Sequence, residues 1–515
     1  MKKYINLIFT VAFILATTIA LTGCDEDFLT AKPTDSQAAG GEATEGAIRA
    51  NLAAAYQILL FDSYADYNFN SIVLMSDLRS DDIYKGGGDA GDQMSLYRLW
   101  QLQPTPTELP EGLWNIYFSG LARTINAIKA CENAVDVEES VLAGLKAEAI
   151  FLRAYYSHWL WKFWGNIPYY YDDFVDEEPY MAPQLDADEV YEKIIADLDT
   201  VIDSEALPMR NSPEDHGKAT HAAAQMLKAR VVMYQKDSDR YGEVMNDMAA
   251  IINSEEFSLV DDFAEIWTRE GEFGEESIFE VNHYPEGRDW GAAWTGFGTN
   301  LPRFISPSEL DGVDLLSGND EFVGGWGFAP VREETVGIFE SGDERLAGSI
   351  NHFAEDTYTQ RFQDTGYFMA KYAARDNYAD APYTPDLNYE NNLRLFRYAE
   401  TLLNAAELIV MHGQNANGVD AQYCLDQIRD RAGLDPISAT EENIKLERRR
   451  EFVGEGMRFW DVVRWGDTDE LFKDDIIDEG RITAWDDYMK YLPIPESEIL
   501  QTSGEYKLEQ NEGYQ

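Results

Sequence analysis

One stretch near the end of the chain, LERRREFVGEGMRFWDVVRWG at Leu446–Gly466, limits how the chain can fold. The chain has 41 Lys and Arg against 94 Asp and Glu, yet five arginines lie here: Arg448, Arg449, Arg450, Arg458 and Arg464. An acid precedes an arginine by three residues at Glu447–Arg450, Glu455–Arg458 and Asp461–Arg464. Residues at this spacing are neighbours on a helix, and a buried arginine needs carboxylate or carbonyl partners because it keeps its charge. The stretch therefore predicts a packed helix that binds other helices through ion pairs. An anion or nucleic-acid site is disfavoured because acids alternate with the arginines.

The same stretch resembles the ERR-x-EL-x-x-EG-x-R-x-x-D-x-x-RWG signature of SusD/RagB-type outer-membrane lipoproteins. Phe452 stands where the family has Leu or another apolar residue. Further matches are RYAETLLNAAEL at Arg397–Leu408, YLPIP at Tyr491–Pro495 and QNEGY at Gln510–Tyr514. The resemblance runs from Cys24 to Tyr514. It implies a mostly α fold, in which a loop-rich ligand-binding portion is inserted into a tetratricopeptide-type helical scaffold.

The N-terminus has the features of a bacterial lipoprotein. Lys2 and Lys3 precede an apolar run, and the sequence LTGC ends at Cys24. This pattern predicts a signal peptide over residues 1–23, lipid attachment at Cys24 and a tether over residues 24–45. The acidic residues directly after Cys24 resemble a surface-export signal. The expected location is the cell surface, anchored by lipid to the outer membrane.

Periodic apolar patterns predict the helices of the scaffold. They cover Glu45–Leu60, Leu113–Ala134, Val137–Gly165, Ala187–Asp203, Lys218–Gln235, Leu393–Gly413 and Val419–Ala432, and Ser277–Val281 is strand-like. We expect one SusD-like unit over residues 46–515. Its scaffold would lie mainly in residues 46–61, 111–254 and 393–466, and its loop-rich portions in residues 62–110 and 255–392. Cys131 and Cys424 lie in helical patterns and are expected to be buried free thiols.

Tryptophans without helical spacing point to the ligand site. Trp290, Trp294 and Trp326 lie among glycines in the longer loop-rich portion, and indole rings stack on the C–H faces of sugars. Weaker candidates in the first loop-rich portion are Arg79, Tyr84 and Trp100. The helical tryptophans are interpreted as packing: Trp114, Trp159, Trp161, Trp164, Trp460 and Trp465.

The sequence carries no strong sign of catalysis. It contains no HExxH pair, Walker loop or G-x-S-x-G elbow, so we predict a binding protein without a metal or cofactor. A surface glycoside hydrolase remains an alternative, because spacing cannot identify a catalytic pair among 94 acids.

The expected partners follow from the resemblance and the charge. The resemblance implies a glycan-binding lipoprotein that delivers oligosaccharides to a SusC-like TonB-dependent transporter. The same role with a non-glycan nutrient is a further alternative. The formal net charge of −53 disfavours nucleic acid as a partner and slightly favours neutral glycans, such as β-glucans.

Overall fold

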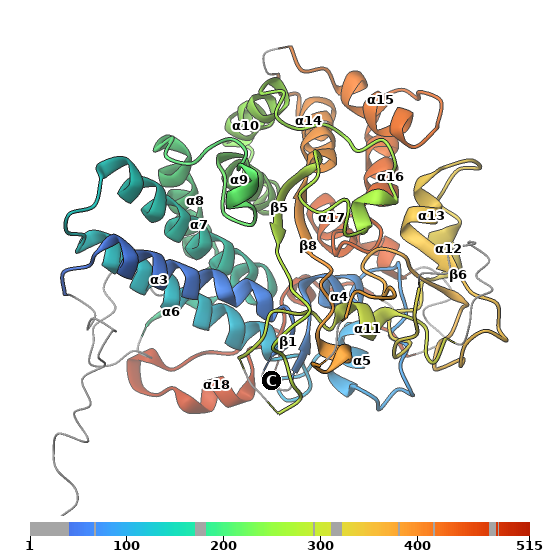
Figure 1. Ribbon diagram of the computed structural model, residues 1–515. Helices are drawn as coiled ribbons and strands as arrows, with labels where there is room; N and C mark the ends of the chain where they lie inside the picture. Colours follow the sequence, from blue (N-terminus) through green and yellow to red (C-terminus); the bar gives the residue numbers. More distant parts are fainter. Residues whose placement is uncertain are drawn as a thin grey trace, which may run out of the picture.

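The computed structural model describes residues 41–65, 68–169, 182–291, 294–310, 322–379, 382–415, 418–472, 480–482 and 484–514 (Figure 1). The predicted signal peptide, Cys24 and most of the predicted tether lie outside these residues. In the described part of the chain, every helix is too short or too polar to cross a bilayer.

Helices dominate the fold, as the sequence predicts. The α-helices are α3 Glu45–Tyr56, α4 Ile72–Asp77, α5 Met94–Trp100, α6 Gly112–Glu132, α7 Glu139–Trp164, α8 Ala187–Asp203, α9 His221–Gln235, α10 Tyr241–Asn253, α11 Leu301–Ile305, α12 Glu333–Val336, α13 Arg345–Ser349, α14 Tyr398–His412, α15 Ala421–Arg431, α16 Glu441–Phe452, α17 Arg458–Trp465 and α18 Glu496–Gln501. Short 3-10 helices are η1 Gln57–Phe61, η2 Pro213–Asp215, η3 Glu265–Trp267, η4 Pro385–Leu387, η5 Thr468–Phe472, η7 Asp487–Lys490 and η8 Gly504–Tyr506. The strands form antiparallel pairs: β1 Ser63–Ala65 with β2 Asn68–Asn70, β3 Ile167–Pro168 with β4 Gln184–Leu185, β5 Ser277–Val281 with β8 Leu393–Arg397, and β6 Ile350–His352 with β7 Tyr367–Met369.

The scaffold is a curved row of helices. In sequence order, α3, α6, α7, α8, α9, α10, α14 and α15 each pack on the next, while β1, α11 and the loops around them lie below and beside the row (Figure 1). The alanine-rich α9 begins where Thr220 Oγ1 accepts a hydrogen bond from Ala223 N at 3.0 Å. A Cβ at Gly120 would lie 2.6 Å from the Tyr156 ring, so glycine lets α6 approach α7 closely.

Two helix predictions need correction. The segment Leu393–Gly413 is not one helix, because its first five residues form β8 and only the rest forms α14. The pairing of β8 with β5 satisfies the backbone of these residues and overrides their helical pattern. The helix at Leu446–Gly466 is also interrupted, because Gly454 and Gly456 adopt positive φ angles of 78° and 72° between α16 and α17.

The interruption changes one of the predicted ion pairs. Asp461 and Arg464 form the expected pair at 2.8 Å. Glu455 lies in the turn, where its carboxylate contacts Lys371 at 2.7 Å and Arg397 at 2.7 Å instead of Arg458. A Cβ at Gly456 would lie 2.9 Å from the Cα of Val73, so this turn packs directly on α4.

The acids of the signature stretch belong to a buried ion network that joins the scaffold to the second loop-rich portion. We define the central ion network as Glu276, Arg345, Lys371, Arg397, Arg431, Glu447, Glu451 and Glu455, all buried or nearly so. Arg397, at the end of β8, contacts three carboxylates of the network: those of Glu276, Glu451 at 3.1 Å and Glu455. Burial alone would raise the pKa of Glu451, but Arg431, Arg397 and Arg345 outweigh it and hold that pKa well below its usual range. The interpretation of this stretch as a structural ion-pair centre fits these contacts.

A second set of ion pairs ties the signature stretch to the loop after α4. Arg458 binds Asp81 through Nε at 2.8 Å, and Arg449 binds Asp82 through Nη2 at 2.6 Å. Burial alone would raise the pKa of Asp81, but Arg449 and Arg458 lower it.

Both free cysteines, Cys131 and Cys424, are buried, as predicted.

Candidate functional site

Two of the predicted tryptophans lie side by side at the surface. The ring centroids of Trp290 and Trp326 are 5.9 Å apart, and their planes differ by 24°. Trp290 is 41% exposed and Trp326 is half-buried. We call this pair the tryptophan platform. Two nearly parallel indoles at a surface offer apolar faces to a flat, amphipathic ligand such as a sugar ring.

Aromatic side chains support the platform from below. Phe69 of β2 packs edge-on against Trp290 and Trp326, with centroid distances of 6.4 and 5.5 Å. Tyr64 of β1 packs edge-on against Trp290 at 5.6 Å, and Phe304 of α11 packs against Trp326 at 5.7 Å. The platform thus joins the two loop-rich portions, since β1 and β2 come from the first and both tryptophans from the second.

Backbone hydrogen bonds fix Trp326. Its N–H donates to the carbonyl of Arg303 at 2.9 Å, and the N–H of Phe328 donates to the carbonyl of Phe304 at 3.1 Å. The segment around Trp326 therefore runs along α11. This arrangement places the indole before any ligand arrives, which lowers the entropic cost of binding.

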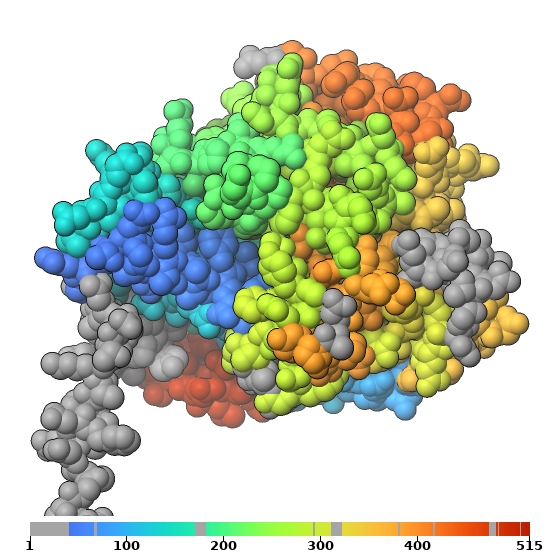
Figure 2. All heavy atoms as spheres, in the orientation of Figure 1, coloured from blue at the N-terminus to red at the C-terminus, as the bar shows by residue number. Residues whose placement is uncertain are grey.

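Trp290 lies in a hairpin that is fixed at its base. We call residues 284–291 and 294–297 the aromatic hairpin; Tyr284 N donates to the carbonyl of Phe297 at 3.1 Å. The buried Arg288 donates to the carbonyls of Tyr64 and, at 2.8 Å, Leu60. In Figure 2 this segment lies at the surface in yellow-green, beside the orange segment that carries Thr384. Thr384 Oγ1 donates to Asp289 Oδ1 at 3.0 Å, which joins the two segments.

Polar groups flank the platform. Arg303, whose carbonyl holds Trp326, contacts Asp386 through Nε at 2.8 Å. Asp289 precedes Trp290 and is exposed. Guanidinium, carboxylate and hydroxyl groups beside an aromatic surface can bind the hydroxyls of a sugar while the rings contact its C–H face. Within the described residues, no group of three or more His, Cys, Asp or Glu side chains is arranged to hold a metal ion.

The pKa shifts near the site belong to groups beneath it. Burial lowers the pKa of His283 to about 3, so this residue is neutral where its Nδ1 contacts the carbonyl of Asn391 at 3.1 Å. Burial also raises the pKa of Asp62 to about 7. The hydrogen bond that Ile72 N donates to its Oδ1 at 2.8 Å lowers this pKa, but by less than burial raises it. These groups support the aromatic hairpin and α4 and do not face a ligand.

Asp62 gives the stability of the protein a defined pH dependence. Its folded-state pKa lies above its unfolded-state value of 3.8, so its burial destabilises the fold as pH rises from about 4 to about 7. Asp62→Asn keeps the acceptor for Ile72 and removes the charge. We expect the variant to melt at a higher temperature than the wild type at about pH 8, with the difference vanishing near pH 4. Asp261→Asn, at an exposed position, is the control. If the melting temperatures of the Asp62 variant and the wild type differ by the same amount at every pH, this assignment is wrong.

The structure separates the remaining predicted site residues from the platform. Trp294 is half-buried, and its ring packs edge-on against Phe61 with centroids 5.3 Å apart. Tyr84 is half-buried and packs near Trp100, with centroids 6.1 Å apart. Trp294 and Tyr84 stay predictions as ligand contacts, without a place on the platform.

Arg79 and Trp100 are corrected, because both are interior residues. Trp100 is fully buried and stacks on Tyr97 at 5.7 Å, so neither of its faces is open to a sugar. The buried Arg79 donates to the carbonyls of Met489 and, at 3.0 Å, Lys490. The guanidinium of Arg79 thus binds backbone carbonyls of the C-terminal segment rather than a ligand.

The structure also shows residues that the sequence did not single out. Phe69 and Phe304 support the platform, and Tyr284 is 53% exposed on the aromatic hairpin. The signal that could have found Tyr284 is the density of aromatic and glycine residues throughout residues 284–297.

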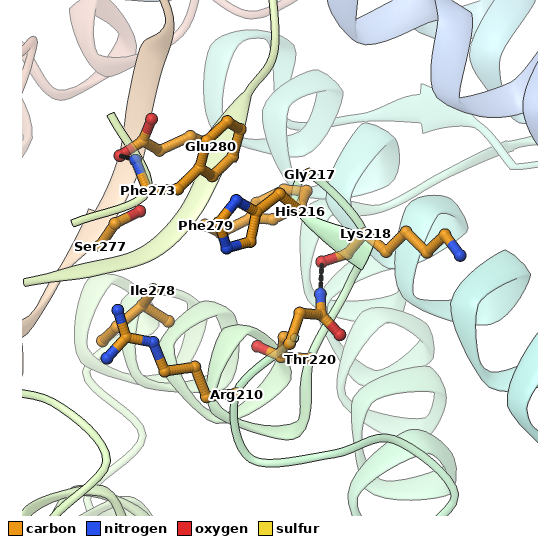
Figure 3. A pocket seen from close by; sticks show the side chains of 11 residues that line it. Arg210, His216, Gly217, Lys218, Thr220, Phe273, Ser277, Ile278, Phe279 and Glu280 are labelled. Atoms are coloured by element: carbon orange, nitrogen blue, oxygen red, sulfur yellow. Dashed lines mark hydrogen bonds between the residues drawn. The ribbon is translucent and has the colours of Figure 1, made fainter. Parts of the chain in front are cut away.

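A concavity apart from the platform lies between β5 and residues 210–220, which precede α9 (Figure 3). Its lining is mostly polar and includes Arg210, His216, Thr220 and Glu280, and the ring of His216 stacks on Phe273 at 4.5 Å. Arg210 already donates to the carbonyls of Glu256 and Gly274. This concavity borders the base of the aromatic hairpin. Gly217 lines the concavity, and a Cβ added to Gly217 would lie 3.6 Å from the Cβ of Asn282.

Comparisons with known proteins agree with the fold and the signature. The profile of the SusD family matches residues 338–514, and a profile described as starch-binding and associating with the outer membrane matches residues 51–233. SusD-like protein P25 of Formosa agariphila is 26% identical over 361 residues, which are 64% of this chain and 65% of that protein.

Solved structures give the stronger similarity. Surface glycan-binding protein A from Bacteroides fluxus is 55% identical with a TM-score of 0.86, covering 92% of this chain and 100% of that one. Surface glycan-binding protein A from Bacteroides thetaiotaomicron, solved in complex with laminarihexaose, is 38% identical with a TM-score of 0.84, covering 91% of this chain and 100% of that one. The identity over nearly the whole chain, together with the two profiles, shows that this chain belongs to the SusD/RagB family.

Proposed function

We propose that this chain binds glycans at the cell surface and that its ligand is a neutral β-glucan of the laminarin type. The observation that carries the proposal is the tryptophan platform: two nearly parallel indoles at the surface, 5.9 Å apart, on an aromatic base. A site already fixed in the free protein spends little of its binding energy on ordering.

The comparisons support the choice of ligand. The Bacteroides thetaiotaomicron relative was solved with laminarihexaose, and a further relative, described as a laminarin-binding SusD-like protein, is 27% identical with a TM-score of 0.79. The net charge of −53 repels sulfated and uronic acid-containing chains, so it favours a neutral glucan. Salt weakens this preference by screening the charge.

Affinity electrophoresis tests the proposal directly. The purified protein would run in gels that contain laminarin, starch, xylan or alginate, and the recovered laminarin would be sized by chromatography. We expect laminarin to retard the protein and to keep its length. Shortened laminarin would favour the glycoside hydrolase alternative, and migration unaffected by every glucan would contradict the proposal.

The proposed cellular role is capture for import. We propose that Cys24 carries the lipid anchor and that the protein delivers its glycan to a SusC-like TonB-dependent transporter; the profile described as associating with the outer membrane supports this location. Mass spectrometry of the mature N-terminus tests the anchor, and an unacylated Cys24 would contradict it. Affinity purification of the full-length protein from outer membranes tests the partner, and the absence of any such transporter would contradict it.

A further inference from the structure

Exposed aromatic side chains are concentrated in the aromatic hairpin. Among the described residues the exposed large apolar side chains are Tyr284, Trp290, Phe297, Val410, Tyr423 and Leu500. Three of these six lie within residues 284–297. Tyr284 and Phe297 are 53% and 40% exposed, so a surface outside the tryptophan platform keeps two aromatic rings in water. Leaving such rings exposed costs stability that burial would recover, and an exposed apolar patch of this kind marks a binding surface.

Hydrogen bonds hold Tyr284 and Phe297 at the base of the aromatic hairpin. Their backbones are joined by the hydrogen bond from Tyr284 N to the carbonyl of Phe297. The residue before Tyr284, the buried His283, donates its N–H to Asn392 Oδ1 at 2.9 Å. Asn282 Nδ2 donates to Tyr284 Oη at 3.0 Å, which fixes the phenol and places an amide beside it. The result is two exposed rings with a polar pair, a combination that suits a sugar.

The pair lies on the same hairpin as Trp290, one of the two indoles of the platform. Asn282, two residues before the hairpin begins at Tyr284, lies beside the concavity of Figure 3. Tyr284 and Phe297 lie six and seven residues from Trp290 on this hairpin, so a long glucan chain that contacts Trp290 has two further exposed rings on the same element.

We propose that Tyr284 and Phe297 form a second glycan-contact surface, which binds the part of a long β-glucan chain that extends past the tryptophan platform. The proposal rests on the proposed function, because the same polysaccharide occupies both surfaces. Its consequence is selectivity for length: the protein binds polysaccharide more tightly than an oligosaccharide that the platform alone can hold.

Calorimetry with two ligands tests this. The double variant Tyr284→Ala/Phe297→Ala, the single variant Tyr284→Ala and the wild type would each be titrated with laminarihexaose and with laminarin. Tyr423→Ala is a matched control, since Tyr423 is also 53% exposed but lies on α15. Thermal melting of each variant confirms folding, and the exposed single variant is the fallback if the double variant unfolds.

The readout is the ratio of the affinity for laminarin to that for laminarihexaose. We expect the double variant to lower this ratio about tenfold, equivalent to about 1.4 kcal/mol, and the Tyr423 control to leave it unchanged. If the affinity ratio of the double variant equals that of the wild type, the proposal of a second surface is wrong. This holds whether the affinities for laminarin and laminarihexaose fall together or both stay unchanged. Failure of the wild type to bind either ligand would instead overturn the proposed function, and this inference with it.

Discussion

Replacing Arg397 with alanine is expected to lower the free energy of unfolding by about 3–5 kcal/mol, because the change strands buried carboxylates. Arg397 is buried and contacts Glu276, Glu451 and Glu455. Its guanidinium also lies 4.9 Å from the centroid of the Phe452 ring. Denaturant titration followed by circular dichroism measures the effect as a lower midpoint.

Two further variants separate the buried network from ordinary surface charge. Arg49→Ala removes an exposed pair with Glu45 on α3 and should cost less than about 1 kcal/mol. Arg397→Lys keeps the charge but loses the planar fork that reaches several carboxylates at once, so it should remain strongly destabilised. A midpoint for Arg397→Ala equal to that of the wild type would contradict the structural role of the central ion network.

Removing either indole of the tryptophan platform should weaken glycan binding by about 1–3 kcal/mol, by analogy with the stacking of bases on aromatic side chains. The variants are Trp290→Ala and Trp326→Ala, titrated with laminarihexaose in a calorimeter. Trp290 is exposed and its loss should leave the melting temperature nearly unchanged, because surface substitutions rarely matter for stability.

The conservative variant Trp290→Phe is the control. It keeps a ring face over Phe69 and should recover part of the affinity. Trp294→Ala tests the third predicted tryptophan, whose ring packs on Phe61. Folded Trp290→Ala and Trp326→Ala proteins that bind laminarihexaose as tightly as the wild type would show that the platform is not the site.

Local patterns in the sequence predicted most of the scaffold. α8 was expected at Ala187–Asp203 and lies at those residues, because an amphipathic period and good helix formers reflect local backbone preferences. β8 was missed because its pairing with β5 is a contact between distant segments. The same limit explains the interrupted signature helix, where Gly454 and Gly456 bring a turn onto α4.

The site was predictable only in part, because burial in a loop depends on which distant segment covers it. Trp100 and Trp290 both lie in regions without helical spacing, yet one is fully buried and the other is 41% exposed. Arg79 was a weaker candidate as a ligand contact, yet its planar guanidinium binds the carbonyls of Met489 and Lys490 in the interior. The pairing of Trp290 with Trp326 arises from tertiary structure, so the sequence could name both residues but could not join them.

A crystal structure of the protein with laminarihexaose tests the central claim most directly. We expect a sugar ring stacked on Trp290 or Trp326, with hydroxyls bonded to the flanking groups of Asp289, Arg303 or Asp386. A hexasaccharide bound elsewhere on the molecule, with both indoles of the platform free of sugar, would contradict it.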